Sequence, residues 1–275
     1  MQNVADSAVS VRGLSAGYGR KAILEDVSFE IPYGKVFAIL GGSGCGKSTL
    51  LKNIIGLYKP LKGDVLIEGR SIVNASDDEK RSIMRGFGVA YQGGALFRAL
   101  SLGENISLPM EEQGKLSPEE IEAAVKAKLA LVNLDGFEDY MPSDLSGGMV
   151  KRAAFARALA LDPKLLFFDE PSAGLDPISS AQLDRLILDI RDRTGATIIL
   201  VTHELPSIFA VADYVIMLDR NAKGIIAQGS PSELRDLCPV EAVRDFMNRF
   251  VVPSSSGSAS SNMAITNKSG SLGDA

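Results

Sequence analysis

The segment from Gly41 to Ser48 constrains the fold of this 275-residue chain more than any other. Its sequence, GGSGCGKS, matches the pattern G-x-x-x-x-G-K-[ST] of loops that bind phosphate groups. It directly follows the apolar run Val36 to Leu40, which is typical of a strand buried on both faces of a parallel sheet. A helical run, Thr49 to Leu57, comes next. Strand, glycine-rich loop and helix in this order predict a nucleotide-binding α/β fold, and a structural turn is the alternative.

The residue types in this loop suit the binding of a nucleotide. Glycines let backbone N–H groups converge on phosphate oxygens, and the helix that follows adds the positive end of its dipole. Lys47 is expected to reach the β- and γ-phosphates, and Ser48 to offer its hydroxyl to Mg²⁺. Cys45 is interpreted as a small residue that fills the loop, with a redox-sensitive thiol as the alternative. The residues predicted to bind the nucleotide here are Gly41, Gly42, Ser43, Gly44, Cys45, Gly46, Lys47, Ser48 and Thr49.

Three polar residues follow two other apolar runs. Asp169 and Glu170 come directly after Leu165 to Phe168, and His203 comes shortly after Ile198 to Val201. In a parallel sheet, ligands bind at the carboxyl ends of the strands, so these side chains are expected beside the phosphate loop. Asp169 would hold the magnesium shell, Glu170 would deprotonate an attacking water, and His203 would donate a hydrogen bond to the γ-phosphate. A solvated strand end and a packing histidine are the alternatives.

The other segments predict how the chain is organised. Residues 101 to 143 have helical character, with a capping box at Ser117 to Glu120. Another helix is expected to end near Gly195, and short helices to follow Ser230 and Pro239. Residues 253 to 275 contain eight Ser and three Gly, which predicts a disordered tail, with an extended strand on a partner as the alternative. Further strands are expected at Val9 to Gly13, Val27 to Ile31, Asp64 to Glu68 and Tyr214 to Leu218.

Composition excludes several classes of function. The net charge of −5 argues against a nucleic-acid backbone as the main partner. One His and two Cys exclude a zinc cage of His and Cys ligands and a disulfide framework. The apolar runs are far shorter than the roughly 18 residues that suggest a membrane span. The first ten residues lack the features of a secretory signal, so we expect a cytosolic location.

The run Leu145 to Met149, sequence LSGGM, resembles the signature of the ABC-type ATPases. The helix that continues from it also has the family's pattern, in Lys151 to Ala154 and Arg157 to Leu159. The order of motifs matches from Tyr18 to His203. The resemblance implies an α/β P-loop NTPase with a mainly parallel core sheet, an N-terminal antiparallel β subdomain and an inserted helical subdomain. The expected domain spans residues 1 to 252, with the helical subdomain at about 93 to 160.

The same resemblance implies roles for further residues. Tyr18 is similar to the family's aromatic residue that stacks on adenine, and a plain turn is the alternative. Gln92 resembles the residue that touches the magnesium shell or the attacking water, and a surface Gln is the alternative. Met149 stands where the family more often has Gln. The signature residues Ser146, Gly147 and Gly148 offer a second anion site, and the resemblance implies a head-to-tail dimer with two ATP molecules at its interface. Asp176 ends a turn that is similar to the segment linking the two sites.

Other runs resemble the ATPase subunits of the Mla/Mce-type transporters. They are Tyr91 to Phe97, Leu102 to Ile106, Met149 and Lys151 to Ala153. This resemblance implies transport of phospholipids or other hydrophobic molecules, from the cytoplasmic face of the inner membrane. The expected partners are integral membrane permease subunits, a small accessory subunit and a Mce-type substrate-binding protein. The alternatives are the ATPase of another ABC importer or exporter, a soluble ABC protein acting on ribosomes or DNA, and a P-loop kinase.

Overall fold

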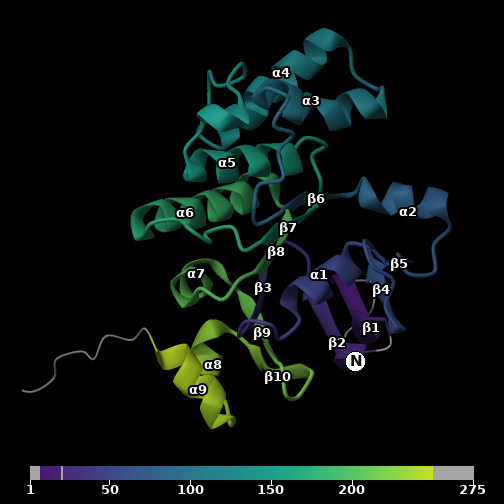
Figure 1. The fold of residues 1–275 in the computed structure, drawn as a ribbon, viewed down its shortest axis with the longest axis vertical. Helices are drawn as coiled ribbons and strands as arrows, with labels where there is room; N and C mark the ends of the chain where they lie inside the picture. Colours follow the sequence, from purple (N-terminus) through teal and green to yellow (C-terminus); the bar gives the residue numbers. More distant parts are fainter. Residues whose placement is uncertain (1–6, 20, 250–275) are drawn as a thin grey trace, which may run out of the picture.

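Two sheets organise the chain in a computed structural model that describes residues 7–19 and 21–249 (Figure 1). The first sheet has the strand order β2-β1-β4-β5 and the second the order β10-β9-β3-β8-β7-β6. The strands are β1 (Ser7–Tyr18), β2 (Lys21–Pro32), β3 (Val36–Gly41), β4 (Lys62–Ile67), β5 (Arg70–Ser71), β6 (Phe87–Ala90), β7 (Leu165–Asp169), β8 (Thr197–Val201), β9 (Tyr214–Asp219) and β10 (Gly224–Gly229).

The helices cover the second sheet and extend beyond it at both ends of the molecule (Figure 1). They are α1 (Lys47–Ile54), α2 (Asp77–Met84), α3 (Leu102–Gln113), α4 (Pro118–Leu131), the 3₁₀ turn η2 (Pro142–Asp144), α5 (Gly147–Ala158), α6 (Pro177–Thr194), α7 (Leu205–Val211), α8 (Pro231–Asp236) and α9 (Glu241–Asn248). Within the described residues, none of them is both long and apolar enough to cross a membrane.

The first sheet is antiparallel, whereas β3, β6, β7, β8 and β9 of the second sheet pair in parallel. Strand β10 pairs with β9 in the antiparallel direction. Parallel pairing places the carboxyl ends of β3, β7 and β8 at the same edge. The residues that follow these strands are therefore brought together there.

Strand β3 is buried on both faces, as its apolar sequence predicts. Val36, Ala38 and Leu40 belong to the core that the sheet shares with α5, α6 and α7. Phe37 and Ile39 belong to the other core, which the sheet shares with α1 and the antiparallel sheet. Because successive side chains alternate between these cores, the strand that leads into the phosphate loop is held from both sides.

The stretch between β6 and β7 forms only helices, and they lie together at one end of the molecule (Figure 1). Buried side chains of α3 and α4, including Ile106 and Leu129, pack into the same core as Phe155 of α5. Helix α4 has the predicted capping box at Ser117. The insertion expected at about residues 93–160 contains these helices, and its exact limits stay a prediction.

The predicted strands and helices are confirmed, with differences in extent. Strands β1 and β2 are twelve residues each, much longer than predicted, because they pair with each other along most of their length. The sequence did not predict β5, β6, β10, α2 or α7. The tail expected at residues 253–275 lies outside the described residues.

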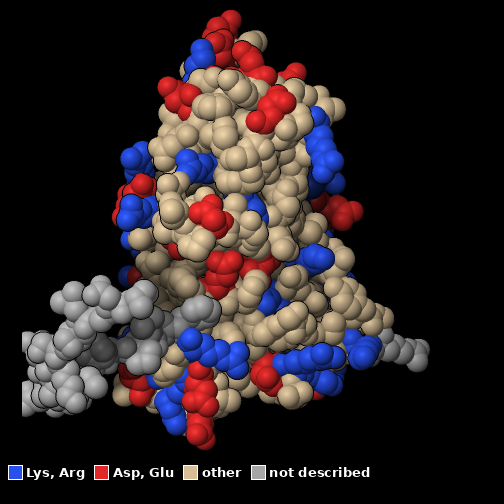
Figure 2. All heavy atoms as spheres, turned by 60° about the vertical axis from the view of Figure 1, so that its left-hand side comes forward, with Lys and Arg blue, Asp and Glu red and all other residues tan. Residues whose placement is uncertain are grey.

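Charge is mixed on the face of the molecule that Figure 2 shows. Figure 2 shows one face of the molecule, on which acidic and basic side chains are interspersed. Over the described residues of that face, neither sign forms a continuous stripe.

Candidate nucleotide site and signature site

The predicted phosphate loop joins the end of β3 to the start of α1, and its backbone requires glycine at both ends. Gly46 caps α1 with a φ of 106°, a conformation that residues with a side chain rarely adopt. A Cβ atom on Gly41 would lie 2.5 Å from the carbonyl oxygen of Leu218 and 2.6 Å from the Sγ atom of Cys45. Cys45 is buried at that position, and burial raises the pKa of its thiol, which agrees with its interpretation as a loop-filling residue.

The ammonium group of Lys47 lies at the centre of the loop. Its Nζ atom donates hydrogen bonds to the carbonyl oxygens of Gly41 at 2.8 Å and Gly42 at 3.4 Å. It also lies 3.8 Å from the Oε1 atom of Glu170, and both side chains are largely buried. The loop therefore holds a cation next to the carboxylate that follows β7, a strand separated from β3 by β8 in the sheet.

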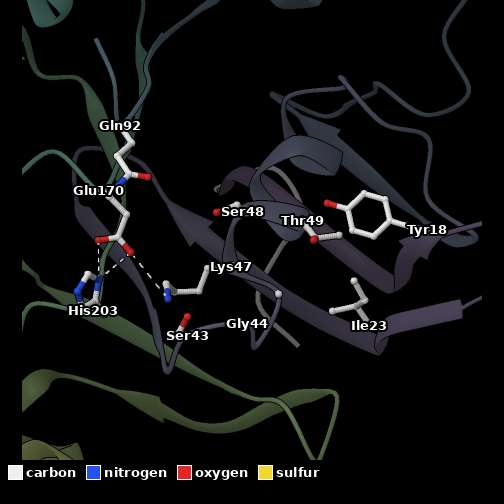
Figure 3. A pocket seen from close by; sticks show the side chains of 11 residues that line it. Tyr18, Ile23, Ser43, Gly44, Lys47, Ser48, Thr49, Gln92, Glu170 and His203 are labelled. Carbon is white, nitrogen blue, oxygen red and sulfur yellow. Dashed lines mark hydrogen bonds and ion pairs between the residues drawn. The ribbon is translucent and has the colours of Figure 1, made fainter. Parts of the chain in front are cut away.

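A cavity of about 450 Å³ opens in front of this loop (Figure 3). It brings together predicted residues from five separate parts of the chain. Ile23 of β2 also lines it and was not predicted; it is an apolar residue on the strand that pairs with the one ending at Tyr18. The lining residues are Tyr18, Ile23, Ser43, Gly44, Gly46, Lys47, Ser48, Thr49, Gln92, Glu170 and His203.

Tyr18 stands at one end of this cavity, where β1 ends (Figure 3). Its side chain is exposed, and its ring packs edge-on against the ring of Tyr58, with centroids 6.1 Å apart. The Tyr58 ring in turn lies 5.4 Å from the Nζ atom of Lys52 on α1. Tyr18 is 55% exposed and lines the cavity, so a planar ligand bound there can reach its ring.

Asp169 and Glu170 lie at the end of β7, as predicted. Glu170 has a φ of 47°, in the left-handed region, and its backbone N–H donates to the carbonyl oxygen of Val201. The Oδ1 atom of Asp169 is buried and has no hydrogen-bond partner. Burial and the charge of Glu170 raise the pKa of Asp169, whereas Lys52, Lys47 and Lys151 lower it.

His203 contacts Glu170 directly. Its Nδ1 atom lies 2.9 Å from Oε1 and 2.8 Å from Oε2 of that residue. A carboxylate can only accept hydrogen bonds, so Nδ1 carries the proton and donates it. The imidazole side chain is 57% exposed and its partner only 11%, so the histidine covers the carboxylate from the solvent side of the cavity.

Gln92, two residues after β6, lines the cavity. Its backbone carbonyl accepts a hydrogen bond from a helix that the sequence did not link to it. The ammonium group of Lys151 on α5 donates to the carbonyl oxygen of Gln92, and lies 3.4 Å from that of Glu170. Lys151 belongs to the run that resembles the family signature, but the sequence alone gave no indication of these contacts.

The signature residues lie elsewhere in the chain. Ser146 caps α5, and its side chain accepts a hydrogen bond from the backbone N–H of Met149 at 3.3 Å. Ser146, Gly147 and Gly148 line a second cavity of about 360 Å³, together with Asp176. This cavity shares no lining residue with the first. The predicted signature site is thus separate from the phosphate loop of its own chain.

Asp176 caps α6 beside the signature. Its carboxylate accepts hydrogen bonds from the hydroxyl of Ser179 and from the backbone N–H groups of Ile178 and Ser179. The bond from the Ser179 side chain is the main reason that the pKa of Asp176 is lowered. Asp176 was predicted to be one of the nucleotide-binding residues. Within one chain it lines the cavity of the signature residues and not the cavity of the phosphate loop.

Oxygen atoms suited to magnesium line the first cavity and lie at the end of β7 next to Glu170, a residue of that lining. The buried Oδ1 atom of Asp169 lacks a partner, and the hydroxyl of Ser48 and the amide of Gln92 line the cavity. In the described residues no cluster of three or more His, Cys, Asp or Glu side chains could hold a metal ion. This donor set fits Mg²⁺, which commonly binds through one or two protein oxygens together with phosphates and waters.

Comparison with known proteins decides the family. A family model described as ABC transporter matches residues 24–173. The chain belongs to the ABC transporter family. It is 43% identical over 241 residues to the probable ribonucleotide transport ATP-binding protein mkl of Mycobacterium leprae, covering 88% of this chain and 69% of that one. It is 36% identical over 248 residues to the intermembrane phospholipid transport system ATP-binding protein MlaF of Escherichia coli K12, covering 90% of this chain and 91% of that one.

Solved structures agree with this ABC assignment. The ATP-binding cassette MJ0796, solved as a dimer in a post-hydrolysis state bound to ADP and Pi, has a TM-score of 0.73. It is 29% identical and covers 81% of this chain and 98% of its own. The predicted α/β P-loop fold with an antiparallel β subdomain is therefore confirmed. This chain is an ATP-binding and ATP-hydrolysing subunit that powers a membrane transporter.

Proposed function

We propose that this chain drives the movement of phospholipids or other hydrophobic molecules across the cell envelope. The supporting observation is its similarity to MlaF, of whose length it covers 91%. The runs around Gln92 and Met149 that resemble Mla/Mce-type ATPases lie beside the nucleotide site and in the signature. In this proposal residues 1–252 form the ATPase domain. It binds at the cytoplasmic face of the inner membrane to permease subunits, a small accessory subunit and a Mce-type substrate-binding protein.

The name of a second relative favours another cargo. The Mycobacterium leprae protein is named for ribonucleotide transport and has the higher identity, although this chain spans a smaller share of its length. Ribonucleotide import is therefore the second candidate.

One experiment separates the two candidate cargoes. The full chain is purified with its membrane subunits in a mild detergent, and bound small molecules are extracted and identified by mass spectrometry. ATP turnover is then measured with phospholipid vesicles or with ribonucleoside monophosphates. Enrichment of phospholipid and stimulation by vesicles support lipid transport. Stimulation by ribonucleotides alone would replace that proposal with the second one.

In the proposed catalytic cycle the first cavity holds ATP. Tyr18 stacks on adenine, the loop amides and Lys47 bind the β- and γ-phosphates, and Glu170 accepts a proton from the attacking water. His203 donates a hydrogen bond to the γ-phosphate, and Gln92 orients the water. Ser48 and Asp169, with Gln92 close by, would hold Mg²⁺, which when bound neutralises charge on the phosphate oxygens.

Two chains complete each site in this proposal. The signature and the phosphate loop line separate cavities of one chain, so one copy cannot use both on the same ATP if these cavities keep their positions. A second copy placed head to tail would bring its Ser146, Gly147 and Gly148, at the N-terminus of α5, onto the γ-phosphate.

The Glu170→Gln variant tests the catalytic part. The amide keeps the shape of the carboxylate but is a poor base, so turnover should fall about 10²- to 10⁴-fold while ATP still binds. Steady-state ATPase activity and nucleotide binding are measured on the same preparation. Turnover at the wild-type rate would remove Glu170 as the base.

A further inference from the structure

A buried lysine on the signature helix joins two segments of the nucleotide site. Lys151 of α5 is 8% exposed, and its ammonium group donates to the backbone carbonyl oxygens of Gln92 and Glu170. The side chains of both partners line the first cavity, whereas Lys151 does not. The lysine therefore acts on the backbone from which these two side chains project.

Burying this ammonium group costs free energy, so its contacts must compensate for the lost hydration. Burial lowers the pKa of Lys151, and the nearby carboxylates of Asp169, Glu170 and Glu204 oppose that change. A buried lysine is tolerated when hydrogen bonds and opposite charges compensate it. Here the hydrogen-bond acceptors are the carbonyl oxygens of Glu170, directly after β7, and of Gln92, two residues after β6.

The pairing of β6 with β7 does not itself fix the positions of Gln92 and Glu170 relative to each other. Strands β6 and β7 pair only as far as Ala90 and Phe168, so Gln92 and Glu170 both lie beyond the last paired residues. Further along the same helix, the guanidinium group of Arg157 donates to the carbonyl oxygens of Gly94 and Ala95. Helix α5 thus holds the segment after β6 at two points, and only the Lys151 contact also reaches Glu170.

The position of Lys151 along α5 adds a second consequence. It lies little more than one helical turn from Ser146, which caps the helix at the signature. A short segment of rigid helix therefore separates the signature from the residues that hold Gln92 and Glu170. The proposed function places a partner's ATP against that signature.

We propose that Lys151 is a positioning residue that sets Gln92 and Glu170 for hydrolysis and ties them to the signature helix. This inference rests on the proposed roles of Gln92, Glu170 and the signature. It predicts that ATP bound against the signature of one chain is linked through α5 to the catalytic geometry of that chain's own site.

The test uses the full chain purified with its membrane subunits. Lys151→Met keeps the length and apolar stem of the side chain but removes the cation, and Lys151→Gln keeps a shorter donor. A displacement of about 1 Å in catalytic groups costs on the order of 10²-fold, so we expect kcat to fall about 10- to 100-fold in both. The KM for ATP and the dissociation constant for ADP should change less than about threefold, because neither measures the water-activating geometry. Lys151→Arg supplies a cation with several donors and should recover much of kcat.

Lys128 provides a matched control. It is also a largely buried lysine on a helix of the same region, and it pairs with Asp162 away from the nucleotide cavity. Lys128→Met should leave kcat within about twofold of wild type. The Hill coefficient for ATP is measured on all variants, and we expect Lys151→Met to bring it closer to 1 than Lys128→Met does.

The outcomes separate this inference from the proposed function. Wild-type kcat in Lys151→Met and Lys151→Gln overturns the inference. So does a loss that is equal in Lys128→Met, or one accompanied by unfolding or by parallel loss of ADP binding, since these assign Lys151 to general stability. Glu170→Gln is assayed alongside. If that variant retains turnover, the proposed function fails regardless of Lys151, and if it is inactive while Lys151→Met is normal, only the inference fails.

Discussion

His203→Ala is the substitution whose consequences follow most directly from the geometry of the site. The imidazole Nδ1–H donates to both carboxylate oxygens of Glu170 at 2.8–2.9 Å. While this N–H donates to Glu170, it cannot also donate a full-strength hydrogen bond to the γ-phosphate. ATP binding is therefore expected to shift the imidazole from Glu170 towards the phosphate, which frees the carboxylate to accept a proton from water.

The magnitude depends on which of these two contacts is lost. A hydrogen bond to a charged group contributes about 1.5–3 kcal/mol, and the 57% exposure of the histidine favours the lower value, or about a 10-fold effect on rate. Removing a preorganised donor to the charge that develops in the transition state costs about 10²- to 10³-fold. Because one imidazole makes these contacts in turn, the two effects do not add, and kcat should fall about 10²- to 10³-fold.

The assay is steady-state ATP hydrolysis by the full chain with its membrane subunits, with nucleotide affinity measured separately by fluorescence. His203→Gln, which keeps a donor, should lie between wild type and His203→Ala. The KM for ATP should change less than about threefold. A kcat within threefold of wild type, or a loss confined to KM, would refute the role argued for the histidine.

Three further predictions concern the proposed stacking of adenine on Tyr18, a buried acid and the packing of the helical insertion. Tyr18→Ala should weaken ATP binding about 5- to 150-fold, measured by titration, because base stacking is worth about 1–3 kcal/mol, whereas Tyr18→Trp should not. Burial raises the pKa of Asp184, so the folded chain binds that proton more tightly than the unfolded chain and the free energy of unfolding falls as pH rises above 3.8. Asp184→Asn, which can still accept from Ser207, should flatten that dependence and be more stable at pH 7 in urea titrations; a steeper dependence would contradict the reasoning. Gly88→Ala should cost about 1–3 kcal/mol in the free energy of unfolding and lower Tm, because its Cβ would clash with the carbonyl oxygen of Ala158, and an unchanged Tm would contradict that packing.

The residues of the phosphate loop could be predicted because their chemistry is local. Gly41 and Gly46 need conformations or space that only glycine provides, and Lys47 and Ser48 follow at fixed spacing. Asp169 and His203 could also be placed at the loop's edge of the sheet, because parallel pairing puts the carboxyl ends of β7 and β8 at the same edge as that of β3.

Other features depend on contacts between distant segments and left no pattern in the sequence. The pairing of Tyr18 with Tyr58 requires the packing of α1 against β1, and the contact of Lys151 with Gln92 requires α5 to cross the end of β6. Strand β6 was missed because its four residues contain Gly88 and are too few for a clear alternation.

The dimer is the central claim, because it alone gives the signature a role in hydrolysis. The most direct measurement is sedimentation of full-length Glu170→Gln with and without ATP. The account predicts a monomer without ATP, a dimer with ATP, and a return to monomer when Ser146→Arg is added, with nucleotide binding by each chain retained. A chain that stays monomeric with ATP, or a dimer that Ser146→Arg leaves intact, would contradict it.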